Sequence, residues 1–184
     1  MDFLKFFHNL EGVKKQVREG WNLHKIPQPE SIADHSYRVA MMALVLSPQA
    51  KLNSEKTMAM ALLHDALHAL VPDTPSKHDE SEQKMTNQEM AEIERKAMKK
   101  LLSNLDQKKA KEFFEMFLDV EEKRTKEGEF VKDLDRLEMC FQALEYEKQH
   151  QKDLSEFFVY SESRLTHPFV KELFQKLKKS RKSL

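Results

Sequence analysis

In this chain of 184 residues, His64 and Asp65 place an imidazole next to a carboxylate inside the largely apolar run 62–67. An unpaired carboxylate in an apolar environment costs several kcal/mol. A metal ion shared with a histidine is one of the few arrangements that offset this cost. The pair is therefore a candidate metal site. The alternative is that His64 and Asp65 pair with each other at the end of a helix, where the helix dipole favours a histidine.

Two further candidate ligands lie far away in the sequence. His35 follows Ser31 and Asp34, which have the spacing of a capping box, and Asp135 is flanked by apolar positions of a helical pattern. Three helices could thus bring two imidazoles and two carboxylates together. This donor set suits a divalent ion such as Mn, Fe, Co, Ni or Zn. Such an ion acidifies water and polarises a phosphoryl oxygen, so the set would favour hydrolysis.

The elements that must position these residues are helices throughout. Apolar residues recur at helical spacing, and capping residues and prolines mark the ends. The expected helices cover 2–19, 31–47, 53–67, 86–102, from 106, about twenty residues after Gly128, 153–165 and 168–179. An ordered loop is expected over 21–30 and a polar loop over 72–85. The sequence therefore predicts an all-α fold, a single helical bundle of about seven to nine helices over 1–184, with a basic tail at about 176–184.

Composition excludes several classes of function. Lys plus Arg and Asp plus Glu both number 31, so no overall basic charge is available for nucleic acid or an anionic membrane. Only three glycines are present, which argues against glycine-rich phosphate loops. The single cysteine, Cys140, excludes an internal disulfide and suits a reducing compartment. We therefore expect a cytoplasmic protein that binds neither nucleic acid nor membrane.

The order of these residues resembles that of the HD-domain metal-dependent phosphohydrolases. A lone histidine is followed 29 residues later by the His-Asp pair, and a distal aspartate follows 70 residues after Asp65. Four further segments are similar to the 5'-deoxynucleotidase branch of that family, namely 18–21, 29–31, 34–38 and 142–147. The resemblance extends over residues 1 to about 175, and the ordered set is far more specific than the His-Asp pair alone.

The resemblance implies a function. A member of this branch would remove phosphate from deoxynucleoside 5'-monophosphates with one divalent ion, drawn from Co, Mn, Mg, Zn, Fe or Ni, and would form a homodimer. The implied metal ligands are His35, His64, Asp65 and Asp135.

The resemblance also implies which residues bind the nucleotide. Arg18 would orient the substrate phosphate, because a guanidinium binds phosphate oxygens bidentately. Trp21 would crowd the 2' position of the sugar, and Asp65 would also contact substrate. Asp73 and Ser76 belong to the loop that contacts the nucleotide, with Asp73 also a catalytic candidate. Without the family, Arg18 could equally be an exposed residue at a helix end and Trp21 an ordinary core anchor.

Two positions depart from the family pattern. His68 stands where the family usually has a glutamate beside the metal, and Pro72 replaces a glycine. His68 could take over proton transfer, become an additional metal ligand, or mark a catalytically weak protein. The alternative function is therefore a degenerate HD domain that binds metal and nucleotide, or a protein partner, with little or no hydrolysis. Pro72 fixes the backbone next to Asp73 and removes a donor, so we expect an altered loop shape there.

Overall fold

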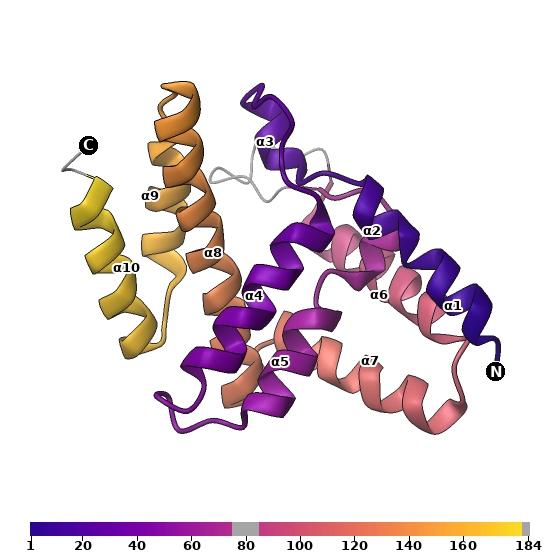
Figure 1. The fold of residues 1–184 in the computed structure, drawn as a ribbon. Coiled ribbons are helices and arrows are strands. Elements are labelled where there is room, and N and C mark those ends of the chain that lie inside the picture. Colours follow the sequence, from indigo (N-terminus) through magenta and orange to yellow (C-terminus); the bar gives the residue numbers. More distant parts are fainter. Residues whose placement is uncertain (75–84, 182–184) are drawn as a thin grey trace. The chain divides into compact units, whose positions relative to one another are not determined.

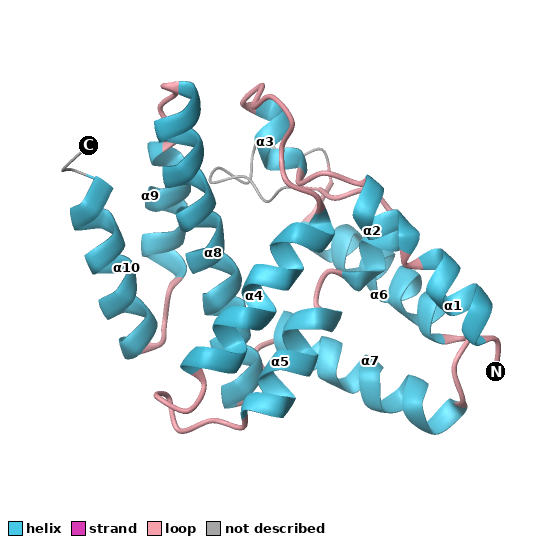
Figure 2. Cartoon of the chain, viewed as in Figure 1, coloured by secondary structure: helices cyan, strands magenta, loops and turns pink. Residues whose placement is uncertain are grey.

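The computed structural model describes residues 1–74 and 85–181, and helices account for nearly all of its regular structure (Figure 2). In those residues the only strand-like pairing is an isolated antiparallel bridge between Val17 and Ser31. The all-α prediction is therefore confirmed. The helices, traced in chain order in Figure 1, are α1 (Phe3–Asn9), α2 (Glu11–Lys15), α3 (Glu19–Leu23), α4 (Ile32–Leu46), α5 (Ser54–Leu63), the 3-10 helix η1 (Ala66–Ala69), α6 (Asn87–Leu102), α7 (Gln107–Glu121), α8 (Lys126–His150), α9 (Ser155–Arg164) and α10 (Pro168–Arg181).

The N-terminal segment is three short helices instead of the single helix expected over 2–19, which raises the number of α-helices in the described residues to ten. The chain leaves the helical conformation at Gln16, whose backbone is extended, and Val17 then pairs with Ser31. The expected loop after Gly20 is also wrong in part, because Gly20 and Trp21 lie within α3. Apolar periodicity alone cannot reveal such a break, since Val13 before it and Val17 after it are both half-buried.

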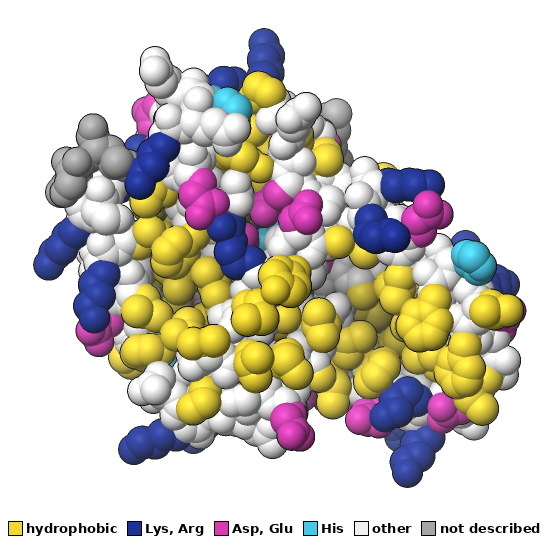
Figure 3. Space-filling model, in the orientation of Figure 1, with side chains coloured by type: hydrophobic (Ala, Val, Ile, Leu, Met, Phe, Trp, Pro, Cys, Tyr) yellow, Lys and Arg dark blue, Asp and Glu magenta, His cyan; other side chains and the backbone are white. Residues whose placement is uncertain are grey.

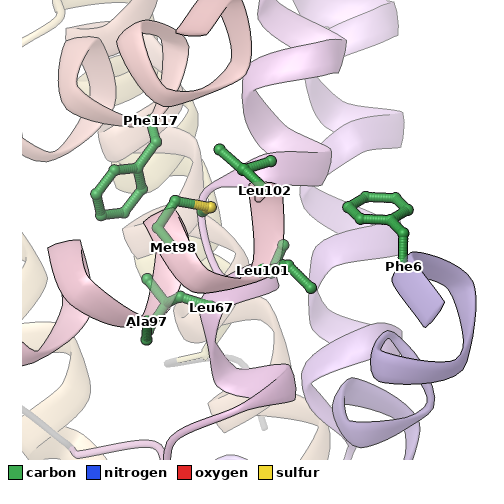
Figure 4. Close-up of a cluster of buried hydrophobic side chains, with 8 residues drawn as sticks. Phe6, Leu67, Ala97, Met98, Leu101, Leu102 and Phe117 are labelled. Carbon is green, nitrogen blue, oxygen red and sulfur yellow. The ribbon is translucent and has the colours of Figure 1, made fainter. Parts of the chain in front are cut away.

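The chain divides into two compact units, of which the first comprises residues 1–36 and 63–118. Its core packs α1, η1, α6 and α7 around one cluster of buried side chains (Figure 4). That cluster contains Phe6, Ala66, Leu67, Ala97, Met98, Leu101, Leu102 and Phe117. Helix α2 also lies against η1, and a Cβ on Gly12 would stand only 2.4 Å from the carbonyl oxygen of Ala69. Glycine at position 12 therefore permits this close backbone approach.

The second unit comprises residues 37–62 and 119–184, and its helices α8, α9 and α10 pack on one another (Figure 1). Within it, Arg38 of α4 reaches three residues of α8. Its Nε donates to Glu138 at 2.7 Å, one Nη donates to Glu145 at 2.9 Å, and the other contacts Gln142. Arg38, Gln142 and Glu145 belong to segments that carried the family resemblance. The ion pairs of Arg38 therefore hold α4 against α8.

The basic C-terminal residues extend α10 as far as Arg181. The guanidinium of Arg181 donates two hydrogen bonds of 2.7 Å to the carboxylate of Glu147, and Lys178 lies 2.6 Å from Glu162. The residues predicted as a basic tail from about residue 176 therefore belong to helix α10 as far as Arg181. Residues 182–184 lie outside the described residues.

An apolar groove of about 560 Å³ lies on the second unit, between α4, α8 and α10. Hydrophobic side chains gather over α4 on the face seen in Figure 3. Met41 and Val45 of α4 are exposed. In the described part of the chain, no helix has the length and apolar character that a membrane span requires.

Candidate metal and phosphate site

The His64-Asp65 pair lies in a turn between two helical segments. Helix α5 ends at Leu63, and the 3-10 helix η1 begins at Ala66, so the expected continuous helix to Leu67 is wrong. His64 is fully buried and Asp65 is 9% exposed. In a 3-10 helix, residues three apart lie above one another. This geometry turns His68 toward Asp65, with Nε2 of His68 4.0 Å from Oδ1 of Asp65, whereas an α-helix would have aligned His68 with His64.

His35 enters the same region from the first turn of α4. The capping box at its start is confirmed, because Ser31 N donates to Asp34 Oδ2 at 2.9 Å and Asp34 N donates to Ser31 Oγ at 3.1 Å. His35 is fully buried. Its Nε2 lies 3.7 Å from Oδ2 of Asp65, and the rings of His35 and His64 have centroids 5.4 Å apart. The cap thus fixes the helix turn that brings His35 to Asp65.

The imidazoles of His35 and His64 converge on one carboxylate oxygen of Asp65. Oδ2 of Asp65 lies 3.3 Å from Nε2 of His64 as well as 3.7 Å from that of His35. Neighbouring ligands of one ion with bonds of about 2.1 Å are separated by roughly 3 Å, so these spacings suit a metal with nitrogen and oxygen donors. Burial of the Asp65 carboxyl disfavours ionisation, but His64 and Arg18 hold its pKa well below the usual range. The donor set therefore fits a divalent ion.

Arg18 lies directly beside these donors. Its Nη1 donates to Oδ2 of Asp65 at 2.7 Å, and its side chain is 18% exposed. The backbone of Arg18 is fixed by a hydrogen bond of 3.1 Å from its N–H to the carbonyl of Glu30. A mostly buried guanidinium that touches a candidate metal ligand can bind an anion at the same place, because it keeps its charge and has further donors. The arrangement therefore suits an oxyanion such as phosphate.

His68 and Asp73 form a second cluster beside the first. Nε2 of His68 lies 3.7 Å from Oδ1 of Asp73, and His68 is 6% exposed. The other carboxylate oxygen of Asp73 accepts a hydrogen bond of 2.8 Å from the backbone N–H of Glu19. Pro72 lies within the segment that joins η1 to Asp73. The structure thus brings together the two residues that the sequence assigned to catalysis.

Three further residues were predicted for the site: Trp21, Asp135 and Ser76. Trp21 is 2% exposed, and its indole Nε1 donates to Glu30 Oε1 at 2.8 Å. Asp135 is half-buried on α8, in the second unit. Ser76 lies outside the described residues. The roles of these three residues remain predictions.

The sequence did not predict two residues that hold the segments around the candidate site, Gln16 and Arg38. Gln16 contacts the backbone of His68 in η1 and of Asp73 in the loop after it, and Arg38 links α4 to α8. The signal for Arg38 was present, since it lies in a segment that resembles the family. No signal pointed to Gln16, because a glutamine at the end of a short helix has no distinctive spacing.

The fold is all-helical, and its site combines a buried His-Asp pair with a distant second histidine and an adjacent arginine. This combination is the pattern expected of an HD domain. A model of the HD domain matches residues 10–178, and the chain belongs to the HD domain family.

Relatives support the same assignment. The chain is 36% identical to the 5'-deoxynucleotidase HDDC2 of Dictyostelium discoideum, over 98% of this chain and 99% of the relative. It is 35% identical to the 5'-deoxynucleotidase hdd1 of Schizosaccharomyces pombe, over 93% of this chain and 86% of that protein. A solved structure of a conserved hypothetical protein from Pyrococcus furiosus superposes with a TM-score of 0.76 at 34% identity, over 96% of this chain and 99% of the other.

Proposed function

We propose that this protein is a metal-dependent 5'-deoxynucleotidase that converts deoxynucleoside 5'-monophosphates into deoxynucleosides and phosphate. Relatives named for that activity, similar over nearly the whole chain, support the proposal. The main structural support for the proposal is that Arg18 and two imidazoles all face one carboxylate oxygen of Asp65. Arg18 lies 2.7 Å from Oδ2 of Asp65, the same oxygen that both buried imidazoles face. A phosphate held by Arg18 would therefore lie beside the metal donors.

The ligands of the divalent ion would be His35, His64 and Asp65, with Asp135 as the fourth. The place of Asp135 in the set rests on the order of residues in the family. Co, Mn, Mg, Zn, Fe and Ni all remain candidates for the ion. When bound, a divalent ion lowers the pKa of water and polarises a phosphoryl oxygen.

The chain's own residues would orient the nucleotide. Arg18 would hold phosphate oxygens through paired hydrogen bonds and offset their negative charge. Trp21 would limit space at the 2' carbon of the sugar, and the loop with Asp73 and Ser76 would contact the nucleoside. Because Trp21 is buried and bonded to Glu30, it would act as a rigid wall instead of a side chain that moves onto the substrate.

His68 would replace the usual glutamate in handling a proton. Its Nδ1 lies 3.3 Å from the carbonyl oxygen of Val71, and its Nε2 faces Asp73 and Asp65. A carbonyl only accepts hydrogen bonds, so in this contact Nδ1 of His68 carries a hydrogen. Nε2 is then the nitrogen available to exchange a proton with the attacking water or the leaving oxygen.

The activity is tested by phosphate release from deoxy- and ribonucleoside 5'-monophosphates with Co, Mn, Mg or Zn supplied in turn. We expect metal-dependent release with a preference for deoxyribose. Arg18→Gln should raise KM at least tenfold, whereas Arg124→Gln should leave it unchanged, because Arg124 is more than a third exposed on the second unit. Absence of release from every 5'-nucleotide, with metal bound, would refute the proposed activity.

We further infer a homodimer and a cytoplasmic location. The dimer follows the resemblance to the family, and the location follows from Cys140 as the single, reduced and buried cysteine. Light scattering coupled to gel filtration measures the first, and imaging of the tagged protein measures the second. A monomeric mass at micromolar concentration would contradict the dimer.

A further inference from the structure

Gln16 connects three of the segments that carry candidate site residues. It follows the last residue of α2, and its own backbone is extended. The carbonyl oxygen of Gln16 accepts a hydrogen bond of 2.9 Å from the N–H of Ile32, the first residue of α4. Arg18 is two residues further along the chain, and His35 lies in the first turn of α4. The backbone of Gln16 therefore ties the segment with Arg18 to the helix with His35.

The side chain of Gln16 extends to a different segment, which comprises His68 in η1 and the loop after that helix. Its Nε2 donates to the carbonyl oxygens of His68 and Val71, the second at 3.3 Å. Its Oε1 accepts from the backbone N–H of Asp73, also at 3.3 Å. Both faces of one amide are thus used, as donor and as acceptor, to hold residues 68–73 in a fixed turn.

This turn sets the orientation of His68 and Asp73. The carbonyl oxygen of Val71, which accepts from Gln16, also lies 3.3 Å from Nδ1 of His68. Since that carbonyl accepts the hydrogen of Nδ1, it directs Nε2 of His68 toward Asp73, 3.7 Å away. Asp73 is held from a second side by the N–H of Glu19 at 2.8 Å. Loss of the Gln16 amide would release the loop at three points while leaving His35, His64 and Asp65 in place.

We propose that Gln16 is a positioning residue for phosphate hydrolysis, acting through the orientation of His68 and Asp73. The inference rests on the proposed function. It assigns no contact between Gln16 and substrate or metal. A displacement of about 1 Å in a group that acts in catalysis can reduce the rate about 100-fold, so the loop need not unfold for activity to fall.

Two variants distinguish the effect of the Gln16 hydrogen bonds from the effect of its side-chain size. Gln16→Glu keeps the shape of the side chain but replaces both N–H donors by an oxygen, which would face two carbonyl oxygens. Gln16→Met has similar length and forms neither type of hydrogen bond. Gln107→Glu is the matched control for the change of charge, because Gln107 is exposed at the first position of α7.

The first measurement is steady-state kinetics on a deoxynucleoside 5'-monophosphate together with Co²⁺ affinity. Gln16→Glu and Gln16→Met should lower kcat about 10- to 100-fold, with KM and the Kd for Co²⁺ within threefold of the wild-type values. Gln107→Glu should change none of the three. Retention of kcat within twofold would overturn the proposal. A parallel loss of Co²⁺ binding would also overturn it, because Gln16 would then act on the metal ligands.

The second measurement does not depend on activity. Amide hydrogen exchange should show faster exchange at Asp73 in Gln16→Met than in the wild type, and NMR of the imidazole nitrogens should show a loss of the Nδ1–H form of His68. Unchanged exchange and an unchanged tautomer would overturn the positioning role. If the wild type released no phosphate from any nucleotide, the proposed function would fail, and this second measurement would still decide whether Gln16 orients His68 and Asp73.

Discussion

At the residue scale, the proposed chemistry depends on His68, which stands where the resemblance to the family implies a glutamate. We expect His68→Gln to lower kcat about 100-fold, because it keeps a polar side chain of similar size but removes the proton-exchanging nitrogen. His68→Glu should retain activity within about tenfold of the wild type, since it restores the carboxylate of the family. Phosphate release and metal content are measured for each variant.

The same variants distinguish the other roles of His68. Loss of bound metal in His68→Gln would indicate that His68 is an additional ligand. A large gain of activity in His68→Glu would indicate that the wild-type protein is catalytically weak. Either result would contradict proton transfer by His68.

Cys140 provides a second prediction at the residue scale. Burial raises the pKa of its thiol to about 12, and the side chain is fully buried on α8. The reactive species is the thiolate, which is therefore scarce at neutral pH. We expect a disulfide reagent to label the native protein at pH 8 only as fast as it unfolds, and to label it at once in guanidinium chloride. Rapid labelling of the native protein would show that the α8 core opens locally.

At the element scale, the close approach of α2 to η1 depends on Gly12, which has no side chain. A Cβ on residue 12 would stand 2.4 Å from a backbone oxygen of Ala69, so one of the two helices must shift to accept it. Gly12→Ala should destabilise the protein by about 1–3 kcal/mol, although alanine is the better helix former.

Chemical denaturation measures this change, and Lys15→Ala on the same helix is the control. The side chain of Lys15 is 71% exposed, so its removal should have an effect below about 0.5 kcal/mol. Equal or greater stability of Gly12→Ala would contradict the close packing of α2 on η1. Because η1 contains His68, a measurable loss of activity should accompany the loss of stability.

At the scale of the whole molecule, the proposed capture of a nucleotide would have to be local, because the protein has no net charge. Lys plus Arg balance Asp plus Glu at 31 each, so the proposed attraction for phosphate would come from Arg18 and the ion. A ligand that binds only the folded state stabilises it by about 2.7 kcal/mol at 100 times its Kd. Co²⁺ at that concentration should therefore raise the Tm by about 5 to 10 °C.

Differential scanning calorimetry with and without chelator tests this effect. His64→Ala should abolish the rise in Tm, and His8→Ala, on the exposed surface of α1, should preserve it. An unchanged Tm in the wild type on addition of every candidate divalent ion would contradict the metal site.

Much of the site could be predicted from the sequence because it depends on residue type and order. His35, His64, Asp65 and Arg18 were identified by their spacing and resemblance, and three of them converge on the fourth, Asp65, in the structure. Helix type and most helix boundaries followed from apolar periodicity and caps, which are local properties of the chain.

Only the tertiary structure determined where the helices break and which residues far apart in the sequence are in contact. The turn at His64-Asp65 and the 3-10 helix after it place His68 beside Asp65 and Asp73, although the periodic pattern favours a continuous helix. Gln16 acquires its role from three backbone groups more than fifty residues away. Periodicity records which side chains are buried, whereas the partners of a buried polar group depend on how the whole chain packs.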